Sequence, residues 1–147
     1  METADLSHHI SRRFNEDLER VRTQVLEMGG VVEAQLAKSL QALTDGDSAL
    51  GESVAIDDLT VNGMEIAIDE ECSRILATRA PTAGDLRLVV AIIKTITDLE
   101  RIGDEAKKIA RMTKLIYSAE RLLLPRFGEI KAAAGIALEM LKKALDA

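Results

Sequence analysis

The sequence predicts an all-α protein: an up-down antiparallel bundle of three long helices, followed by a fourth helix. Three observations support this class. Aromatic residues make up only 2% of the 147 residues and there are two prolines, while Leu, Ile, Val, Ala, Glu, Lys and Arg dominate, a helix-forming composition. Apolar residues recur at helical spacing over long stretches. Short turn sequences separate these stretches, which favours antiparallel neighbours.

The composition also limits the function. A net charge of −6 disfavours nucleic acid, whose phosphates require a basic surface. The single cysteine rules out an internal disulfide, which fits a reducing compartment. No N-terminal segment resembles a signal peptide, and the most apolar stretch, 86–96, is too short and too interrupted by Lys94 to span a bilayer. We therefore expect a cytoplasmic protein without direct membrane insertion.

The first 43 residues predict a short arm followed by a long helix. Residues 1–10 should form the arm, and residues 11–117 a bundle whose first helix runs from about Ser11 to Leu43. Gly29-Gly30 interrupts this helix, which indicates a close helix–helix approach or a local bend. The apolar stripe of the helix comprises Phe14, Leu18, Val21, Val25, Met28, Val32, Leu36 and Leu43.

The second helix should run from about Ser48 to Thr78. Gly46 supplies the left-handed residue that ends the first helix, and Asp47 the N-cap of the second. Gly63 suggests a tight contact, and Cys72 lies on the apolar stripe, where we expect a buried, inert thiol. The stripe comprises Leu50, Val54, Val61, Met64, Ile68, Cys72, Ile75 and Leu76.

The third helix should follow Pro81 and reach about Ile116. Proline disfavours helix in the residue before it, and Thr82 with Asp85 resembles a capping box in which Asp replaces the usual Glu. The inner face of this helix comprises Val89, Ile92, Ile93, Ile96, Leu99 and Gly103.

Residues 118–147 predict an additional helix that begins near Pro125, which fits a first helical turn. Its apolar positions are Ile130, Ile136, Met140, Leu141 and Leu145. At an offset of 105 residues, Gly30, Leu36, Lys38, Leu40 and Ala42 match Gly135, Leu141, Lys143, Leu145 and Ala147. The fourth helix thus resembles the start of a second copy of the first unit. Its apolar face needs cover, from its own bundle or from another chain.

Acidic side chains fall inside or beside the apolar stripes of the second and third helices. Where these helices are neighbours, carboxylates converge near a core and require a positive partner. Oxygen ligands suit hard cations such as Mg²⁺, Mn²⁺ or Ca²⁺, and carboxylate clusters also hold iron. The candidate metal residues are Asp58, Asn62, Glu65, Glu100 and Asp104.

An intramolecular ion-pair network is the alternative to a metal. The basic residues that could form it are Arg101, Lys94, Lys107 and Lys108. Nucleophilic catalysis finds little support, because both histidines lie in the arm, and no glycine-rich phosphate loop is present.

These residues resemble the PhoU family of regulators, which accompany bacterial phosphate-import ABC transporters. The likeness is most specific in the run from Asp98 to Asp104. It covers most of the chain through Ser11-Arg12-Arg13-Phe14, Val25-Leu26-Glu27-Met28-Gly29-Gly30, Val32-Glu33, Gln35-Leu36, Asp58, Val61-Asn62, Glu65, Cys72, Ile75-Leu76-Ala77, Pro81, Asp85-Leu86-Arg87, Lys94 and Ile109-Ala110.

The resemblance implies two similar three-helix bundles and metal-binding motifs of the form Glu/Asp-x-x-x-Asp. Glu100 and Asp104 match this motif, and Asp58 with Asn62 matches its counterpart on the second helix, where Asn62 would lower the charge of a bound cluster. The chain departs from the family in length, since only the first helix of the second bundle has a counterpart. The expected metals are Mg, Mn, Fe or Zn.

The resemblance also implies a non-enzymatic regulator of phosphate uptake and phosphate-starvation signalling. Its expected partners are the ATPase subunit of the transporter and a sensor histidine kinase, with Arg101 as a partner-binding residue, at the periphery of the inner membrane. We also expect a homodimer. The alternatives are a metal-binding or storage bundle and a structural oligomerisation module.

Overall fold

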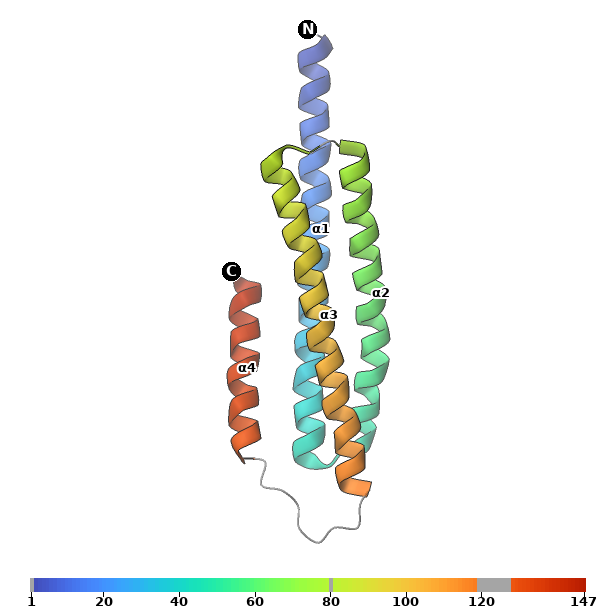
Figure 1. Cartoon of the computed structure of the whole chain (residues 1–147), viewed down its shortest axis with the longest axis vertical. Helices are drawn as coiled ribbons and strands as arrows, with labels where there is room; N and C mark the ends of the chain where they lie inside the picture. The colour runs from blue at the N-terminus through green and yellow to red at the C-terminus, as the bar shows by residue number, and fades with distance from the viewer. Residues whose placement is uncertain (1, 80, 119–127) are drawn as a thin grey trace.

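The computed structural model describes residues 2–79, 81–118 and 128–147, except for the side chains of residues 2 and 7–11. The four described helices are α1 (Glu2–Asp45), α2 (Ser48–Arg79), α3 (Ala83–Ser118) and α4 (Gly128–Asp146). Helices α1, α2 and α3 pack against one another in an up-down bundle, and α4 packs on α1 alone among the described residues (Figure 1). The predicted all-α class is therefore confirmed.

The bundle core consists of the apolar stripes that helical spacing predicts. Cys72 is fully buried, and burial together with the nearby negative charges of Asp69 and Glu71 raises the pKa of its thiol to about 11. The thiol is therefore protonated at neutral pH. The main core cluster contains Phe14, Val21, Met28, Val32, Val61, Ile68, Cys72, Ile75, Val89, Ile96 and Leu99.

The N-terminal part of α1 differs from the expected arm. The helix begins at Glu2 rather than near Ser11, and its first turns project beyond the ends of α2 and α3 (Figure 1). No neighbouring helix among the described residues packs on this part of α1, so its sequence does not need an apolar stripe. Because the helix was expected from the apolar stripe, these turns were not predicted.

The predicted turns are present. Gly46 has a φ of 67°, the left-handed conformation that ends α1, and the backbone N–H of Leu50 donates to Asp47 Oδ1 at 3.0 Å, as an N-cap requires. At the start of α3 the Thr82 hydroxyl bonds Asp85 Oδ2 at 2.8 Å. This side-chain pair stands in for the reciprocal backbone contacts of a full capping box.

Helix α4 runs antiparallel to α1 and is held by few side chains (Figure 1). Leu141 and Leu145 pack against the core at the α1 side, and Lys142 lies 3.5 Å from Glu33 in an ion pair. None of the α4 residues is buried. Pro125, where this helix was expected to begin, lies outside the described residues.

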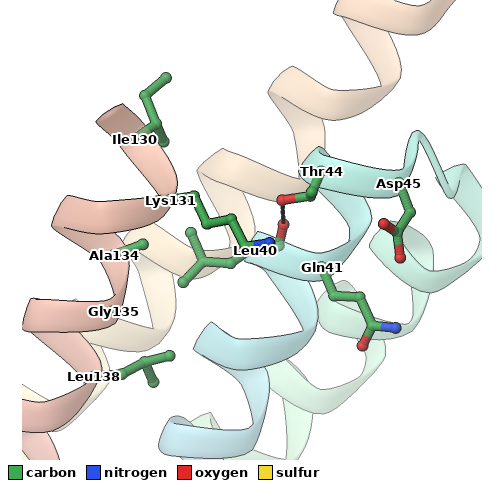
Figure 2. A pocket seen from close by; sticks show the side chains of 9 residues that line it. All are labelled: Leu40, Gln41, Thr44, Asp45, Ile130, Lys131, Ala134, Gly135 and Leu138. Carbon is green, nitrogen blue, oxygen red and sulfur yellow. Dashed lines mark hydrogen bonds between the residues drawn. The ribbon is translucent and has the colours of Figure 1, made fainter. Parts of the chain in front are cut away.

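The contact between α1 and α4 involves leucines and small residues of both helices. A Cβ added to Gly29 would meet the Leu145 side chain, while Leu40 and Ala134 line one cleft between the two helices (Figure 2). At the offset of 105 residues, Gly29 corresponds to Ala134 and Leu40 to Leu145. The sequence match therefore relates Gly29 and Leu145, which lie close together, to Ala134 and Leu40, which line the same cleft.

Of the two glycines expected to mark close helix contacts, one does so and the other does not. Gly29 marks a close helix approach, as expected, whereas nothing lies within 4 Å of a Cβ placed on Gly63. The expected tight contact at Gly63 is therefore wrong, because this residue lies on the outer face of α2. None of the described helices combines the length and apolar character that crossing a membrane requires.

Candidate functional site

A buried polar group joins the three bundle helices in the middle of the core. Asp58 on α2 is 1% exposed and Gln35 on α1 is 0% exposed. The Gln35 amide nitrogen donates to Asp58 Oδ1 at 3.3 Å and to the Val54 carbonyl at 3.2 Å. From α3, Lys107 Nζ donates to Asp58 Oδ2 at 3.2 Å. Because a buried carboxylate is costly without partners, these bonds explain how Asp58 is accommodated.

Gly103 makes room for this group. A Cβ on Gly103 would lie 2.9 Å from Gln35 Oε1 and 3.5 Å from Asp58 Oδ1. Gln35 Oε1 is buried and has no hydrogen-bond partner among the residues that the structure describes. Since buried acceptors are normally paired, this oxygen is an exception within the polar group.

Beside this group, α2 and α3 bring three further carboxylates together. Glu65, Glu100 and Asp104 are half-buried. Burial, followed by the negative charge of Asp104, a like charge on Glu65 and a hydrogen bond with Asp104, raises the pKa of Glu100. Burial and the charges of Asp69 and Asp104 likewise raise the pKa of Glu65. Burial is thus the largest cause of the raised pKa values of Glu65 and Glu100, and repulsion within this acidic cluster, Glu65, Glu100 and Asp104, adds to it.

The donor chemistry of the cluster fits a hard cation, because its ligands would all be oxygens. The geometry is not closed around one: within the described ranges, no three acidic, histidine or cysteine side chains are arranged to hold a metal ion. Asn62 is half-buried nearby on α2, and Asp58 is already engaged by Lys107.

Of the basic residues considered for an ion-pair network, Lys107 reaches a candidate acid. Arg101 and Lys108 instead lie 3.8 Å from Asp98 and 2.7 Å from Glu105, one turn away on the surface of the same helix. Lys94 is exposed. Among the described residues, Lys107 with Asp58 is the core ion pair of the expected kind. No described ion pair joins a base to Glu65, Glu100 or Asp104, although the charge of Asp104, after the hydrogen bond and charge of Glu105, helps to raise the pKa of Lys108.

A second ionic group, which the sequence interpretation missed, lies near the end of the bundle where α2 terminates. Asp17 of α1 is buried and accepts from Arg79 Nε at 3.1 Å, while Arg74 and Arg20 lie at 3.1 and 3.3 Å. Glu71 completes the group through Arg74 at 2.6 Å and Arg20 at 3.0 Å. Helical spacing could have revealed Asp17, because this residue lies between Phe14 and Val21 on the apolar face of the helix.

The Asp17 group differs electrostatically from the acidic cluster. Burial by itself would raise the pKa of Asp17, but the hydrogen bonds and charges of Arg79 and Arg74 outweigh it and lower that pKa. The hydrogen bond from Arg74 lowers the pKa of Glu71 as well. These carboxylates are satisfied, which is typical of a structural ion-pair group rather than of a ligand site.

A cleft of about 350 Å³ lies between the end of α1 and the start of α4 (Figure 2). Its Thr44 hydroxyl already donates to the Leu40 carbonyl at 2.9 Å, and among the described residues of its lining Lys131 is the cationic one. The cleft carries no set of groups suited to catalysis. Its lining comprises Leu40, Gln41, Thr44, Asp45, Ile130, Lys131, Ala134, Gly135 and Leu138.

The fold and the site define a class: a helical bundle with inward-facing carboxylates on neighbouring helices. Residues 25–113 match the model of the PhoU domain. The chain belongs to the PhoU family.

Relatives with known names are similar along almost the whole chain. The phosphate-specific transport system accessory protein PhoU of Serratia marcescens is 48% identical over 100% of this chain and 60% of its own length. The corresponding Escherichia coli protein is 46% identical with the same coverage. This chain therefore spans about 60% of the length of the curated relatives it matches.

Solved structures share the fold. The crystal structure of PhoU from Pseudomonas aeruginosa superposes with a TM-score of 0.87 at 45% identity, covering 91% of this chain and 64% of that one. The phosphate transport system regulatory protein PhoU from Streptococcus pneumoniae gives 0.82 at 30% identity, covering 91% and 62%.

Proposed function

We propose that this chain acts as a non-enzymatic accessory protein that regulates phosphate uptake and phosphate-starvation signalling. The observation that carries the proposal is identity of 46–48% along the whole chain to proteins named as accessory to the phosphate-specific transport system. In this role it contacts the ATPase subunit of a phosphate ABC transporter and a sensor histidine kinase from the cytoplasmic side of the inner membrane.

The surface of the bundle supports an adaptor role. Docking between helical proteins uses exposed side chains repeated along a helix. Apolar side chains of this kind lie on the outer faces of α2 and α3, beyond what a monomer needs for its core. They are Ile56, Leu59 and Ile66 on α2, and Leu86, Leu88, Val90, Met112 and Leu115 on α3.

Arg101 provides a specific test of partner binding. Its side chain is 75% exposed and lies 3.8 Å from Asp98, so the Arg101→Glu substitution should not disturb the core. We expect this variant to lose co-purification with the transporter ATPase subunit and to raise transcription from a phosphate-starvation promoter in high phosphate, while keeping its unfolding temperature.

Arg22→Glu is the matched control for Arg101→Glu. Arg22 is 70% exposed and lies 3.9 Å from Glu19 in the same i,i+3 arrangement on α1. The Arg22→Glu variant should still co-purify with the ATPase subunit and still repress the phosphate-starvation promoter. If the two variants give the same results, Arg101 is not part of the partner surface. If transcription from the promoter in high phosphate is unchanged in a strain without the gene, the regulatory proposal itself is contradicted.

We further propose that the acidic cluster binds a cation, either a divalent ion such as Mg, Mn or Zn, or iron. Burial, followed by the negative charges of neighbouring carboxylates, raises the pKa of Glu65 and of Glu100, and this cost of holding the two carboxylates ionised supports the proposal. Glu65, Glu100 and Asp104 would hold the ion, with Asn62 and Asp58 as further oxygen donors. The bound cation would neutralise charge and tie α2 to α3.

The cation proposal is tested on protein purified without chelator. We expect elemental analysis to find a stoichiometric metal, and added Mn²⁺ to raise the unfolding temperature of the wild type but not that of the Glu100→Gln/Asp104→Asn double variant. Asp5→Asn/Asp98→Asn removes two exposed carboxylates elsewhere and should respond like the wild type. No metal and no thermal shift would reject the proposal.

A further inference from the structure

Helix α2 carries an apolar row on its solvent-facing side. Ile56, Leu59 and Ile66 are 67%, 71% and 60% exposed, and Gly63 completes the row at a spacing of three, four and three residues. Residues at this spacing lie along one side of a helix, and the exposed side of a helix normally carries charged residues. The exposed residues of α2 between 53 and 68 are instead all uncharged: Ala55, Ile56, Leu59, Thr60, Gly63, Ile66 and Ala67.

The packing of the bundle does not account for this outer row, Ile56, Leu59, Gly63 and Ile66. Among the described residues, α2 contacts α1 and α3 but not α4, which packs on α1 (Figure 1). None of the described atoms lies within 4 Å of a Cβ placed on Gly63. A glycine inside a helix is destabilising relative to alanine, but it allows another backbone to approach closely.

Carboxylates lie at both ends of the outer row. Glu52 and Glu70 continue the row four residues beyond either end, and the rise of a helix separates them by about 27 Å. Residues 48–73 contain no Lys, Arg or His. Glu52 lies 3.8 Å from Lys114, but the two side chains are 68% and 69% exposed, and such surface pairs contribute little. The row is therefore apolar in the middle and acidic at its ends.

We propose that the outer row docks an amphipathic helix of a partner protein, whose apolar residues repeat at three- and four-residue spacing between Lys or Arg residues at its two ends. The apolar side chains of the partner pack along the row, its backbone approaches Gly63, and its basic residues pair with Glu52 and Glu70. The inference rests on the adaptor role proposed above, and it adds the chemistry of the docked element.

The carboxylates favour such a partner over a second copy of this chain. Two copies of α2 paired in parallel would place each carboxylate against its own counterpart. In the antiparallel pairing, Glu52 would face Glu70 of the other copy, because both lie equally far from the centre of the row. Like charges across a helix pair are destabilising, so both arrangements are disfavoured, whereas basic residues at these places are attracted.

The test uses the full chain and a fluorescently labelled synthetic peptide, with binding measured by fluorescence anisotropy. The peptide is about 25 residues long, enough to span the two carboxylates. It has leucines at alternating three- and four-residue spacing and lysines at both ends. We expect it to bind the wild type, and expect about tenfold weaker binding of a peptide with the leucines reordered or with glutamates in place of the lysines.

Variants of the outer row test where the peptide binds. Ile66→Gln should weaken binding about tenfold, while its matched control, Ile136→Gln, should leave binding unchanged, because Ile136 is 64% exposed on α4. Gly63→Gln should also weaken binding without lowering the unfolding temperature, because the added side chain blocks a partner but meets no described atom of the bundle.

The carboxylates are tested through the salt dependence of binding. Glu52→Gln/Glu70→Gln should weaken binding at low salt and remove most of its dependence on salt concentration. Asp5→Asn/Asp98→Asn, which removes two exposed carboxylates elsewhere, should behave like the wild type. Equal salt dependence of the two double variants would contradict the pairing of basic residues with Glu52 and Glu70.

The remaining outcomes separate this inference from the adaptor role. Failure of the wild type to bind the lysine peptide, or unchanged binding by Ile66→Gln, would overturn the inference. A dimer in sedimentation that Ile66→Gln converts to a monomer would assign the row to a second copy and overturn it as well. In cells, normal promoter regulation by Ile66→Gln would reject the row as the partner surface, whereas an unaffected promoter after deletion of the gene would reject the regulatory role itself.

Discussion

Gly103 shows how one missing side chain shapes the polar centre of the bundle. In the middle of a helix a glycine costs about 1 kcal/mol relative to alanine, so this position carries a local penalty. The absence of a side chain leaves room for the Gln35 amide, whose oxygen lies 2.9 Å from the position that a Cβ would take. The contacts of this amide offset the penalty. The amide in turn holds Asp58.

Gly103→Ala is therefore expected to lower the free energy of unfolding, by about 1–2 kcal/mol. The added methyl group displaces Gln35, and loss of a buried hydrogen bond costs about 1–3 kcal/mol, which exceeds the gain in helix propensity. Gly63→Ala, where nothing lies within 4 Å, should instead raise it by up to about 1 kcal/mol. Urea unfolding measures both, and equal signs would contradict the role given to Gly103.

At the scale of the element, α4 differs from the other helices because other helices cover little of its surface. Leu141 and Leu145 attach it to the core. The apolar side chains that remain exposed are Ile130, Ile136 and Met140. Helix stability in proteins comes mostly from packing of an apolar face. A helix with one lightly packed side should open more readily than the bundle.

We accordingly expect the backbone amides of α4 to exchange with deuterium faster than those of α2 and α3. Local opening requires only that a few contacts with α1 are lost. Leu145→Ala should speed exchange in α4 further and leave exchange in α3 unchanged. Protection of α4 equal to that of α2 would show that α4 is held more firmly than its contacts indicate.

At the scale of the whole molecule, the two acidic groups act oppositely on stability. The lowered pKa of Asp17 gives stability that is present above its unfolded value of 3.8 and lost as the pH falls through the folded value. The raised pKa of Glu65 and of Glu100 means that the folded state holds protons above 4.5, so stability falls as the pH rises through that range.

Metal-free wild type should therefore be most stable in the mildly acidic range, losing stability toward both lower and neutral pH. Glu100→Gln/Asp104→Asn should flatten the decline toward neutral pH, because like charges at i,i+4 no longer repel. Asp17→Asn should flatten the decline at low pH instead. Unfolding free energies measured in a chelator between pH 3 and 8 test this, and a parallel shift of both variants would contradict it.

The sequence was sufficient for the class of fold and for the inward position of Asp58. Rotation of about 100° per residue placed Asp58 among apolar side chains, and it is buried. Partners were not predictable in the same way, because they depend on which helices are neighbours and how far side chains reach. Lys107 was one of four possible bases, and Asp17 was overlooked because Leu18, beside it, already filled the apolar stripe.

The Asp17 group has a mechanical consequence for α1. It fastens α1 to Arg79, the last residue of α2, one turn after Phe14, which still lies in the core. The first turns of α1 extend beyond α2 and α3 (Figure 1). An isolated helical segment of that size is marginal in water. On warming, α1 should therefore unfold from Glu2 as far as the Asp17 group, at a temperature well below that at which the three-helix bundle unfolds.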